Sequence, residues 1–254
     1  MTDILIKRLP NFNSKNKELI SFMATTLITG SNRGIGFEFV RQYVQKGWNV
    51  IACCRQPEGA SSLQQLANSF PDLVTIYQLD VADHSQISYL SNHLKNTPID
   101  LLINNAGIYP PSDDGGFGKI DYEAWHKAFQ INTMAPLKMA EAFLTQISNS
   151  QLKTIAIITS KMGSIDDNRG GGSYIYRSSK TAVNMVGKSL SIDLKSQGIT
   201  TVMLHPGWVR TDMGGPDALI STQESVLGMQ KILSNLKLSD SGKFFAYDGK
   251  NIPW

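Results

Sequence analysis

The chain has 254 residues, of which 41% are hydrophobic and 18% charged, and its formal net charge is +3 at pH 7. This composition is typical of a globular protein and excludes a disordered or coiled-coil chain, and the length fits one α/β domain. The basic residues are scattered and no apolar run reaches the roughly 18 residues of a membrane helix, so neither nucleic acid nor a membrane is an expected partner.

The first 22 residues are polar, rich in Lys and Asn, and without the apolar stretch of a signal peptide. Asp3, Glu18 and the scarcity of Arg count against the alternative of an organelle-targeting segment. We therefore predict that residues 1–22 are a dispensable extension or reflect a mis-set start, that residues 23–254 form the domain, and that the protein is cytoplasmic. The two cysteines, Cys53 and Cys54, are adjacent in a predicted strand, so they point to opposite faces and are expected to stay reduced.

From Thr25 onward, apolar strands alternate with segments of helical length, which predicts an α/β, doubly wound, mostly parallel sheet with helices on both faces. Seven strands are predicted, at Thr25–Thr29, Asn49–Cys54, Val74–Gln78, Leu101–Asn104, Thr154–Thr159, Thr200–His205 and Lys243–Ala246. Helices over Tyr122–Ser148 and Ser173–Gln197 are apolar enough to cover the sheet and also to face a second subunit, which favours a homodimer or homotetramer. Ser221 with Glu224 predicts a capped helix start, and Pro110–Gly118 predicts a loop.

A glycine-rich turn, Gly30-Ser31-Asn32-Arg33-Gly34-Ile35-Gly36, separates the first strand from a helical apolar pattern. Amide N–H groups left free in such a turn, together with the positive end of the helix, bind a dinucleotide pyrophosphate. A plain strand-to-helix turn is the alternative.

The second strand ends at Arg55 and lacks the carboxylate that binds a free ribose 2′-hydroxyl. Arg33 and Arg55 instead offer positive charge where a 2′-phosphate would lie, which predicts NADP(H) as the cofactor in preference to NAD(H). The alternative is that both arginines are solvated surface residues.

Further cofactor contacts are predicted after the third and fourth strands. Asp80, followed by Val81, could accept a hydrogen bond from an adenine amino group or could open a helix. The small residues of Asn104-Asn105-Ala106-Gly107 let the backbone approach a cofactor closely. Asn132 lies inside a predicted helix, where it could kink the helix or hold a water, or be a capped surface residue.

Tyr176 and Lys180 lie four residues apart on one helix face. A phenol has a free pKa of about 10, which a nearby ammonium should lower, so the pair predicts a catalytic acid. Ser160 ends the fifth strand at the carboxyl edge of the sheet, where ligands bind. Hydride arriving at a carbonyl carbon leaves negative charge on the oxygen, which Ser160 would stabilise and Tyr176 would protonate. Tyr174 has no Lys four residues on and is not a candidate.

The four histidines show no ligand spacing, so no metal is predicted. Asp166, Asp167, Arg169 and the glycines that follow predict a loop at the substrate mouth, or a loop of structural role only. The segment Thr211–Ser221 is too short for a large lid, which favours an open pocket for small or medium carbonyl compounds.

In this order and spacing, the glycine turn, the Asn-Asn-Ala-Gly stretch, Asn132, Ser160, the Tyr-x-x-x-Lys pair and Pro206-Gly207 resemble the short-chain dehydrogenase/reductases over nearly all of Met23–Trp254. The resemblance implies a Rossmann-type fold and a catalytic tetrad of Asn132, Ser160, Tyr176 and Lys180, with cofactor contacts to Tyr176 and Lys180 as well. It also implies that Pro206, Gly207, Val209 and Thr211 lie beside the nicotinamide.

Within that family, residues 160–164, residues 205–215 and the closing residues 247–254 resemble the sniffer-type carbonyl reductases and the C-factor signalling proteins. The expected function is therefore NADPH-dependent reduction of a ketone or aldehyde to an alcohol. The alternative is a nucleotide-binding signalling protein with little or no turnover.

Overall fold

The computed structural model describes residues 23–110 and 116–254. The predicted extension over residues 1–22 lies outside the described residues, as do residues 111–115 of the loop predicted at Pro110–Gly118.

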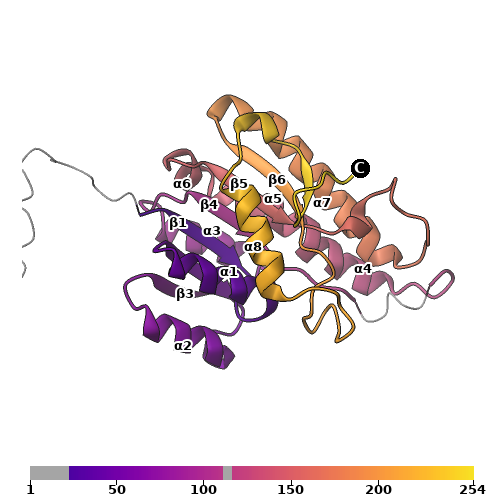
Figure 1. Cartoon of the computed structure of the whole chain (residues 1–254), viewed down its shortest axis with the longest axis horizontal. Coiled ribbons are helices and arrows are strands. Elements are labelled where there is room, and N and C mark those ends of the chain that lie inside the picture. The colour runs from indigo at the N-terminus through magenta and orange to yellow at the C-terminus, as the bar shows by residue number, and fades with distance from the viewer. Residues whose placement is uncertain (1–22, 111–115) are drawn as a thin grey trace, which may run out of the picture.

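Seven parallel strands form one sheet in the order β3-β2-β1-β4-β5-β6-β7 (Figure 1). Their bounds are β1 (Thr25–Thr29), β2 (Asn49–Cys54), β3 (Val74–Gln78), β4 (Leu101–Asn104), β5 (Thr154–Ile158), β6 (Thr200–His205) and β7 (Phe244–Ala246). The predicted Rossmann-type sheet is confirmed, with β5 ending one residue earlier and β7 beginning one residue later than expected. Strand order reverses between β1 and β4, and open sheets of this kind bind ligands in the crevice at such a point.

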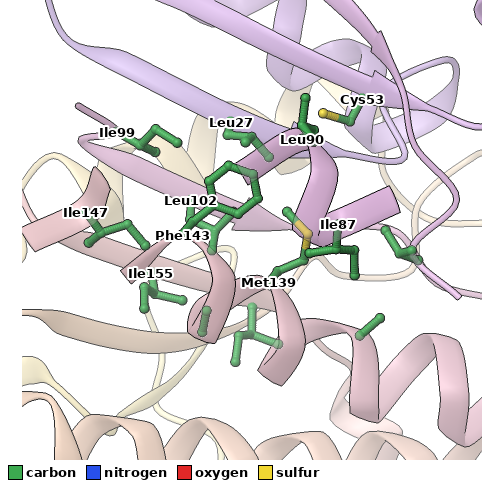
Figure 2. Close-up of a cluster of buried hydrophobic side chains, with 14 of the residues drawn as sticks. Leu27, Cys53, Ile87, Leu90, Ile99, Leu102, Met139, Phe143, Ile147 and Ile155 are labelled. Atoms are coloured by element: carbon green, nitrogen blue, oxygen red, sulfur yellow. The ribbon is translucent and has the colours of Figure 1, made fainter. Parts of the chain in front are cut away.

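Helices cover both faces of the sheet and bury a separate hydrophobic cluster on each. The α1-side core packs β-strand residues under α1 (Gly34–Gln45), α2 (Ser61–Ser69) and α8 (Thr222–Leu233). The α7-side core lies under α3 (His84–His93), α5 (Ala135–Ala142), α6 (Leu144–Ser148) and α7 (Tyr174–Asp193). Figure 2 shows the α7-side core, where the fully buried ring of Phe143 lies among Leu102 and Met139. Truncating a buried Phe of this kind to Ala costs about 3–5 kcal/mol.

The two adjacent cysteines of β2 point into different cores, as predicted. Cys53 belongs to the α7-side core and Cys54 to the α1-side core, and both thiols are free. Successive side chains of a strand alternate between the two faces of its sheet, so neighbours in sequence are separated by the sheet itself.

The single helix predicted over Tyr122–Ser148 is wrong, because the chain is divided there into four parts. After α4 (Tyr122–Phe129) comes a π-helical turn (Gln130–Met134), then α5 and α6. Pro136 in the first turn of α5 has no N–H to continue the α-helical bond pattern, and Asn132 turns its side chain to a loop outside the helix.

The other predicted helix begins and ends close to where the sequence indicates. It is α7, followed by a 3₁₀ turn at Lys195–Gln197 and stopped by Gly198 with φ of 73°. Met185 and Ile192 are 67% and 64% exposed on its surface, and a dimer through this helix stays a prediction. At α8 the predicted cap is confirmed, since Ser221 Oγ accepts from the Glu224 amide at 3.1 Å. Within residues 23–110 and 116–254, no helix has both the length and the apolar character needed to cross a membrane.

Candidate active site

A cavity of about 760 Å³ opens at the carboxyl edge of the sheet, where the turns after β1 and β4 meet. Most of the predicted cofactor residues line it, and so do Tyr176 and Lys180. The predicted residues in its wall are Gly30, Asn32, Arg33, Gly34, Ile35, Gly36, Arg55, Asp80, Val81, Asn105, Ala106, Gly107, Tyr176, Lys180, Pro206 and Thr211.

The glycine turn leaves room for a ligand because side chains are excluded from its inner surface. Gly30 has φ of 66°, and a Cβ there would lie 2.9 Å from Ala106 Cα. A Cβ on Gly36 would collide with the Gly30 carbonyl oxygen and lie 2.5 Å from Asn105 Nδ2. Among the described residues no side chain caps α1 and its first turn carries no acidic residue, so the positive helix end faces the cavity unneutralised. These features fit a pyrophosphate.

Four predicted cofactor residues lie beside the cavity and are not among the described residues of its wall: Ser31, Asn104, Gly207 and Val209. Ser31 donates both its amide and its hydroxyl to the Cys53 carbonyl at 3.0 Å, which ties the turn to β2 and leaves neither donor for a phosphate. Asn104 is buried at the end of β4, and Val209 forms a bridge with Ile220. Ser31, Asn104 and Val209 therefore stabilise the segments that form the wall and do not themselves line the cavity.

The two predicted arginines both line the cavity, but Arg33 already has a partner. Its guanidinium contacts Asp212, which lies 179 residues away on the loop after β6, and the two side chains are 70% and 75% exposed. An exposed pair of this kind stabilises by at most about 1 kcal/mol, so a phosphate can displace the carboxylate. Asp80 also lines the cavity, and it stabilises the turn after β3, because its Oδ1 accepts a hydrogen bond from the Ala82 amide at 3.0 Å. The cap of α3 is a different residue, Asp83.

Asn132 is 1% exposed, which excludes the surface alternative and agrees with the predicted kink. Its Oδ1 accepts from the Ile108 amide at 2.8 Å, and its Nδ2 donates to the Ile108 carbonyl at 2.9 Å and to Ser179 Oγ at 3.0 Å. The π-helical turn therefore fixes both the loop after β4 and the second turn of α7. A Cβ on Gly107 would lie 3.2 Å from Asn132 Oδ1 and 3.5 Å from Lys180 Nζ, so these groups meet around Gly107.

Tyr176 lies in the first turn of α7, with its side chain 8% exposed at the cavity wall. Burial raises the pKa of Tyr176 to about 12, while a hydrogen bond with the Ser160 side chain works in the opposite direction. The predicted lowering of the phenol pKa by Lys180 is therefore wrong, because desolvation is the larger effect. Tyr174, which the spacing rejected, has a side chain 41% exposed.

Lys180 is 5% exposed, and its Nζ donates to the Ile158 carbonyl at 3.1 Å and lies 5.7 Å from the centre of the Tyr176 ring. Burial lowers the pKa of Lys180 to about 8. At neutral pH the Tyr176 phenol is therefore protonated, and burial destabilises the positive charge of the Lys180 ammonium.

Replacing Lys180 by Met is expected to raise the thermal midpoint of the cofactor-free protein at acidic and neutral pH. Below about pH 8 the folded and unfolded states both carry the charge, so its full burial cost is present. Between about pH 8 and the free value of 10.5 the folded state releases the proton, and wild-type stability rises with pH. Losing the bond to Ile158 offsets about 1 kcal/mol of the gain.

Calorimetric midpoints of both proteins at about pH 6, 8 and 10 check this sign. The difference should be largest at the lowest pH and shrink toward the highest. A variant less stable than wild type at the lowest pH, or a difference independent of pH, contradicts it.

Two residues of the site, Asp212 and Tyr109, were not predicted from the sequence. Asp212 lies in the stretch that contains Pro206 and several glycines, and no local pattern indicates that its partner is Arg33, 179 residues away. Tyr109 lies two residues after Gly107, and its ring centre is 4.8 Å from that of Tyr176. An aromatic residue two positions after the Asn-Asn-Ala-Gly stretch was the available signal. No group of three or more His, Cys, Asp or Glu in the described part of the chain is arranged to hold a metal ion.

Comparisons with known proteins agree with this geometry. The family model described as short chain dehydrogenase matches residues 24–218. The C-signal of Myxococcus xanthus is 44% identical over 160 residues, which cover 62% of this chain and 93% of that protein. The crystal structure of an NADPH-bound carbonyl reductase from chicken fatty liver is 36% identical, with a TM-score of 0.85 over 91% of this chain and 99% of that one. The carbonyl reductase Sniffer of D. melanogaster is 34% identical, with a TM-score of 0.84 over 91% of this chain and all (100%) of that one.

Proposed function

Since this chain belongs to the short-chain dehydrogenase family, we propose that it reduces a ketone or aldehyde carbonyl with NADPH, and that Tyr176 gives the proton. The observation that carries the proposal is the buried pair of Tyr176 and Lys180 at the wall of a cavity that also contains an uncapped helix end, with the buried Ser160 side chain hydrogen-bonded to Tyr176. The chicken carbonyl reductase with NADPH bound supports the choice of cofactor.

The residues of this chain divide the chemistry between binding and proton transfer. A bound NADPH supplies the hydride. The Ser160 hydroxyl donates to the substrate oxygen and so stabilises the charge that develops there. Because burial holds the pKa of Tyr176 at about 12, the phenol is still protonated at neutral pH and gives its proton only to a much stronger base, such as the alkoxide formed in the reaction.

Lys180 and Asn132 support the roles of Ser160 and Tyr176. The Lys180 ammonium stabilises the phenolate left after proton transfer and can bond the nicotinamide ribose. Asn132 holds the loop after β4 through both Ile108 bonds, which keeps Gly107 close to Lys180. In this proposal a single domain that begins near Met23 contains the whole site. The site consists of the tetrad, the turn that binds the pyrophosphate, and the two arginines that bind the 2′-phosphate.

The test is oxidation of NADPH and of NADH, followed by absorbance, with a panel of dicarbonyls, quinones, aldehydes and ketones. Turnover with a preference for NADPH supports the proposal and ranks the substrate classes. Tight binding of NADPH without turnover of any member would favour the second candidate, a nucleotide-binding signalling protein. The 44% identity to the Myxococcus xanthus C-signal is the observation that favours that candidate.

Replacing Arg33 and Arg55 together by Ala is expected to weaken NADPH binding by about 10- to 100-fold and to leave NADH binding nearly unchanged. The reason is that both guanidiniums line the cavity and only NADPH carries the 2′-phosphate that they would bind. Fluorescence titration with each cofactor measures the effect. Lys95→Ala, which removes an exposed charge outside the cavity wall, is the control. Equal losses for NADPH and NADH would contradict the assignment.

A further inference from the structure

The residue that begins the catalytic helix has an unusual backbone. Ser173 is the N-cap of α7 and has φ of 43° and ψ of 46°, a left-handed conformation that side chains with a Cβ rarely adopt. A serine at this position normally caps the first turn by accepting from a backbone amide. Within the described residues, Ser173 makes no such bond to α7.

The Ser173 hydroxyl is instead bonded to a different part of the site. Its Oγ lies 2.9 Å from the hydroxyl of Tyr109, which is 64 residues earlier in the loop after β4. The same Tyr109 packs its ring against Tyr176, with centres 4.8 Å apart and planes tilted by 47°. Aromatic pairs at this separation attract one another and fix their mutual orientation.

Both contacts bear on the position of the phenol. Tyr176 is the third residue of α7, so a small rotation of the first helical turn moves its hydroxyl relative to Ser160. A residue in a sparsely populated backbone conformation persists only where its surroundings hold it, and such residues cluster at functional sites. Tyr109 supplies that hold from outside the helix.

We propose that Tyr109 is a positioning residue for Tyr176: its hydroxyl holds the first turn of α7 through Ser173, and its ring fixes the plane of the Tyr176 ring. The proposal rests on the proposed reductase function for its kinetic consequence. The loop after β4 thereby contributes twice to the site, through the Asn132 bonds to Ile108 and through the next residue, Tyr109.

The test compares Tyr109→Phe, which keeps the ring and removes the hydroxyl, with Ser173→Gly, which removes the other partner and suits the left-handed backbone. Each is expected to lower kcat by about tenfold, with the NADPH dissociation constant unchanged. The double variant should lose no more than either single one, because both remove the same bond. Tyr174→Phe, on the same helical turn but exposed, is the control.

A purely structural role of the Tyr109–Ser173 bond would lower the thermal midpoint together with kcat. Under the proposal the two measurements diverge. Ser173→Gly relieves the backbone conformation, so its thermal midpoint should equal or exceed that of wild type while kcat falls. Losses in kcat that add in the double variant, or a wild-type kcat in Tyr109→Phe, would overturn the proposal.

Hydrogen exchange provides a readout that does not depend on catalysis. The Arg177 amide donates to the Ser173 carbonyl at 2.9 Å, and its exchange should be faster in Tyr109→Phe than in wild type or in Tyr174→Phe. Unchanged exchange would overturn the hold on α7 even if the wild-type protein reduced no carbonyl compound. Faster exchange in a protein without turnover would support the hold and reject the reductase function separately.

Discussion

Tyr176→Phe is expected to lower kcat for carbonyl reduction by about 10²–10⁴-fold, the usual contribution of a positioned acid, and to leave NADPH affinity nearly unchanged. The substitution removes one oxygen and keeps the ring that packs against Tyr109. The Ser160 hydroxyl loses its phenolic partner but still accepts from the Met162 amide at 3.1 Å, so the loop after β5 keeps its local support. The loss should therefore appear in the chemical step.

Stopped-flow measurement of a single turnover, together with cofactor titration, separates the two effects. A primary isotope effect with deuterated NADPH should become fully expressed in the variant, because hydride and proton transfer then limit the rate. Tyr174→Phe should match wild type in both measurements. A Tyr176→Phe protein that retains wild-type kcat would remove Tyr176 from the mechanism.

Gly36→Ala is expected to weaken NADPH binding by about 10- to 100-fold and to destabilise the protein by about 1–3 kcal/mol. The added Cβ would collide with the Gly30 carbonyl oxygen and lie 2.5 Å from Asn105 Nδ2, so the turn after β1 and the turn after β4 would have to separate. Asn105 Nδ2 now donates to the Thr29 and Gly30 carbonyls, and both bonds would be disturbed.

The sign of the stability change in Gly36→Ala shows whether helix propensity or steric exclusion is the larger effect at this position. Gly36 lies in α1, where helix propensity alone favours Ala over Gly by about 1 kcal/mol. Steric exclusion must therefore exceed propensity for the prediction to hold. Gly59→Ala is the matched control, because no atom lies within 4 Å of a Cβ at that position. Thermal unfolding and cofactor titration should show losses in Gly36→Ala alone; equal stability of the two variants would contradict the argument.

The sheet could be predicted from the sequence because its strands are short runs rich in β-branched and other apolar residues, separated by segments of helical length. β1 and β4, for example, are buried at every position, so they read as core strands without knowledge of their neighbours. Tyr176 and Lys180 could be found for a similar reason, since a spacing of four residues on one helix is a local property.

The features that were missed depend on residues distant in sequence. Asn132 indicated a kink, but no residue near it signals its partners Ile108 and Ser179, so the π-helical turn at Gln130–Met134 and the division of the helix were not predicted. The pKa of Tyr176 was predicted in the wrong direction because the spacing shows the ammonium of Lys180 and does not show how much water both groups lose. Burial is a property of the whole fold.

The division of Cys53 and Cys54 between the two cores gives β2 two neighbouring thiols that report on different halves of the molecule. A thiol-reactive reagent reaches Cys53 when the layer of α3, α5, α6 and α7 opens, and it reaches Cys54 either when the layer of α1, α2 and α8 opens or through the cavity. Cys54 also lines the cavity, so a ligand bound there shields it directly while Cys53 responds only to the stability of its layer. With a ligand bound in the cavity, the ratio of their labelling rates therefore distinguishes opening of one helical layer from cooperative unfolding of the entire domain.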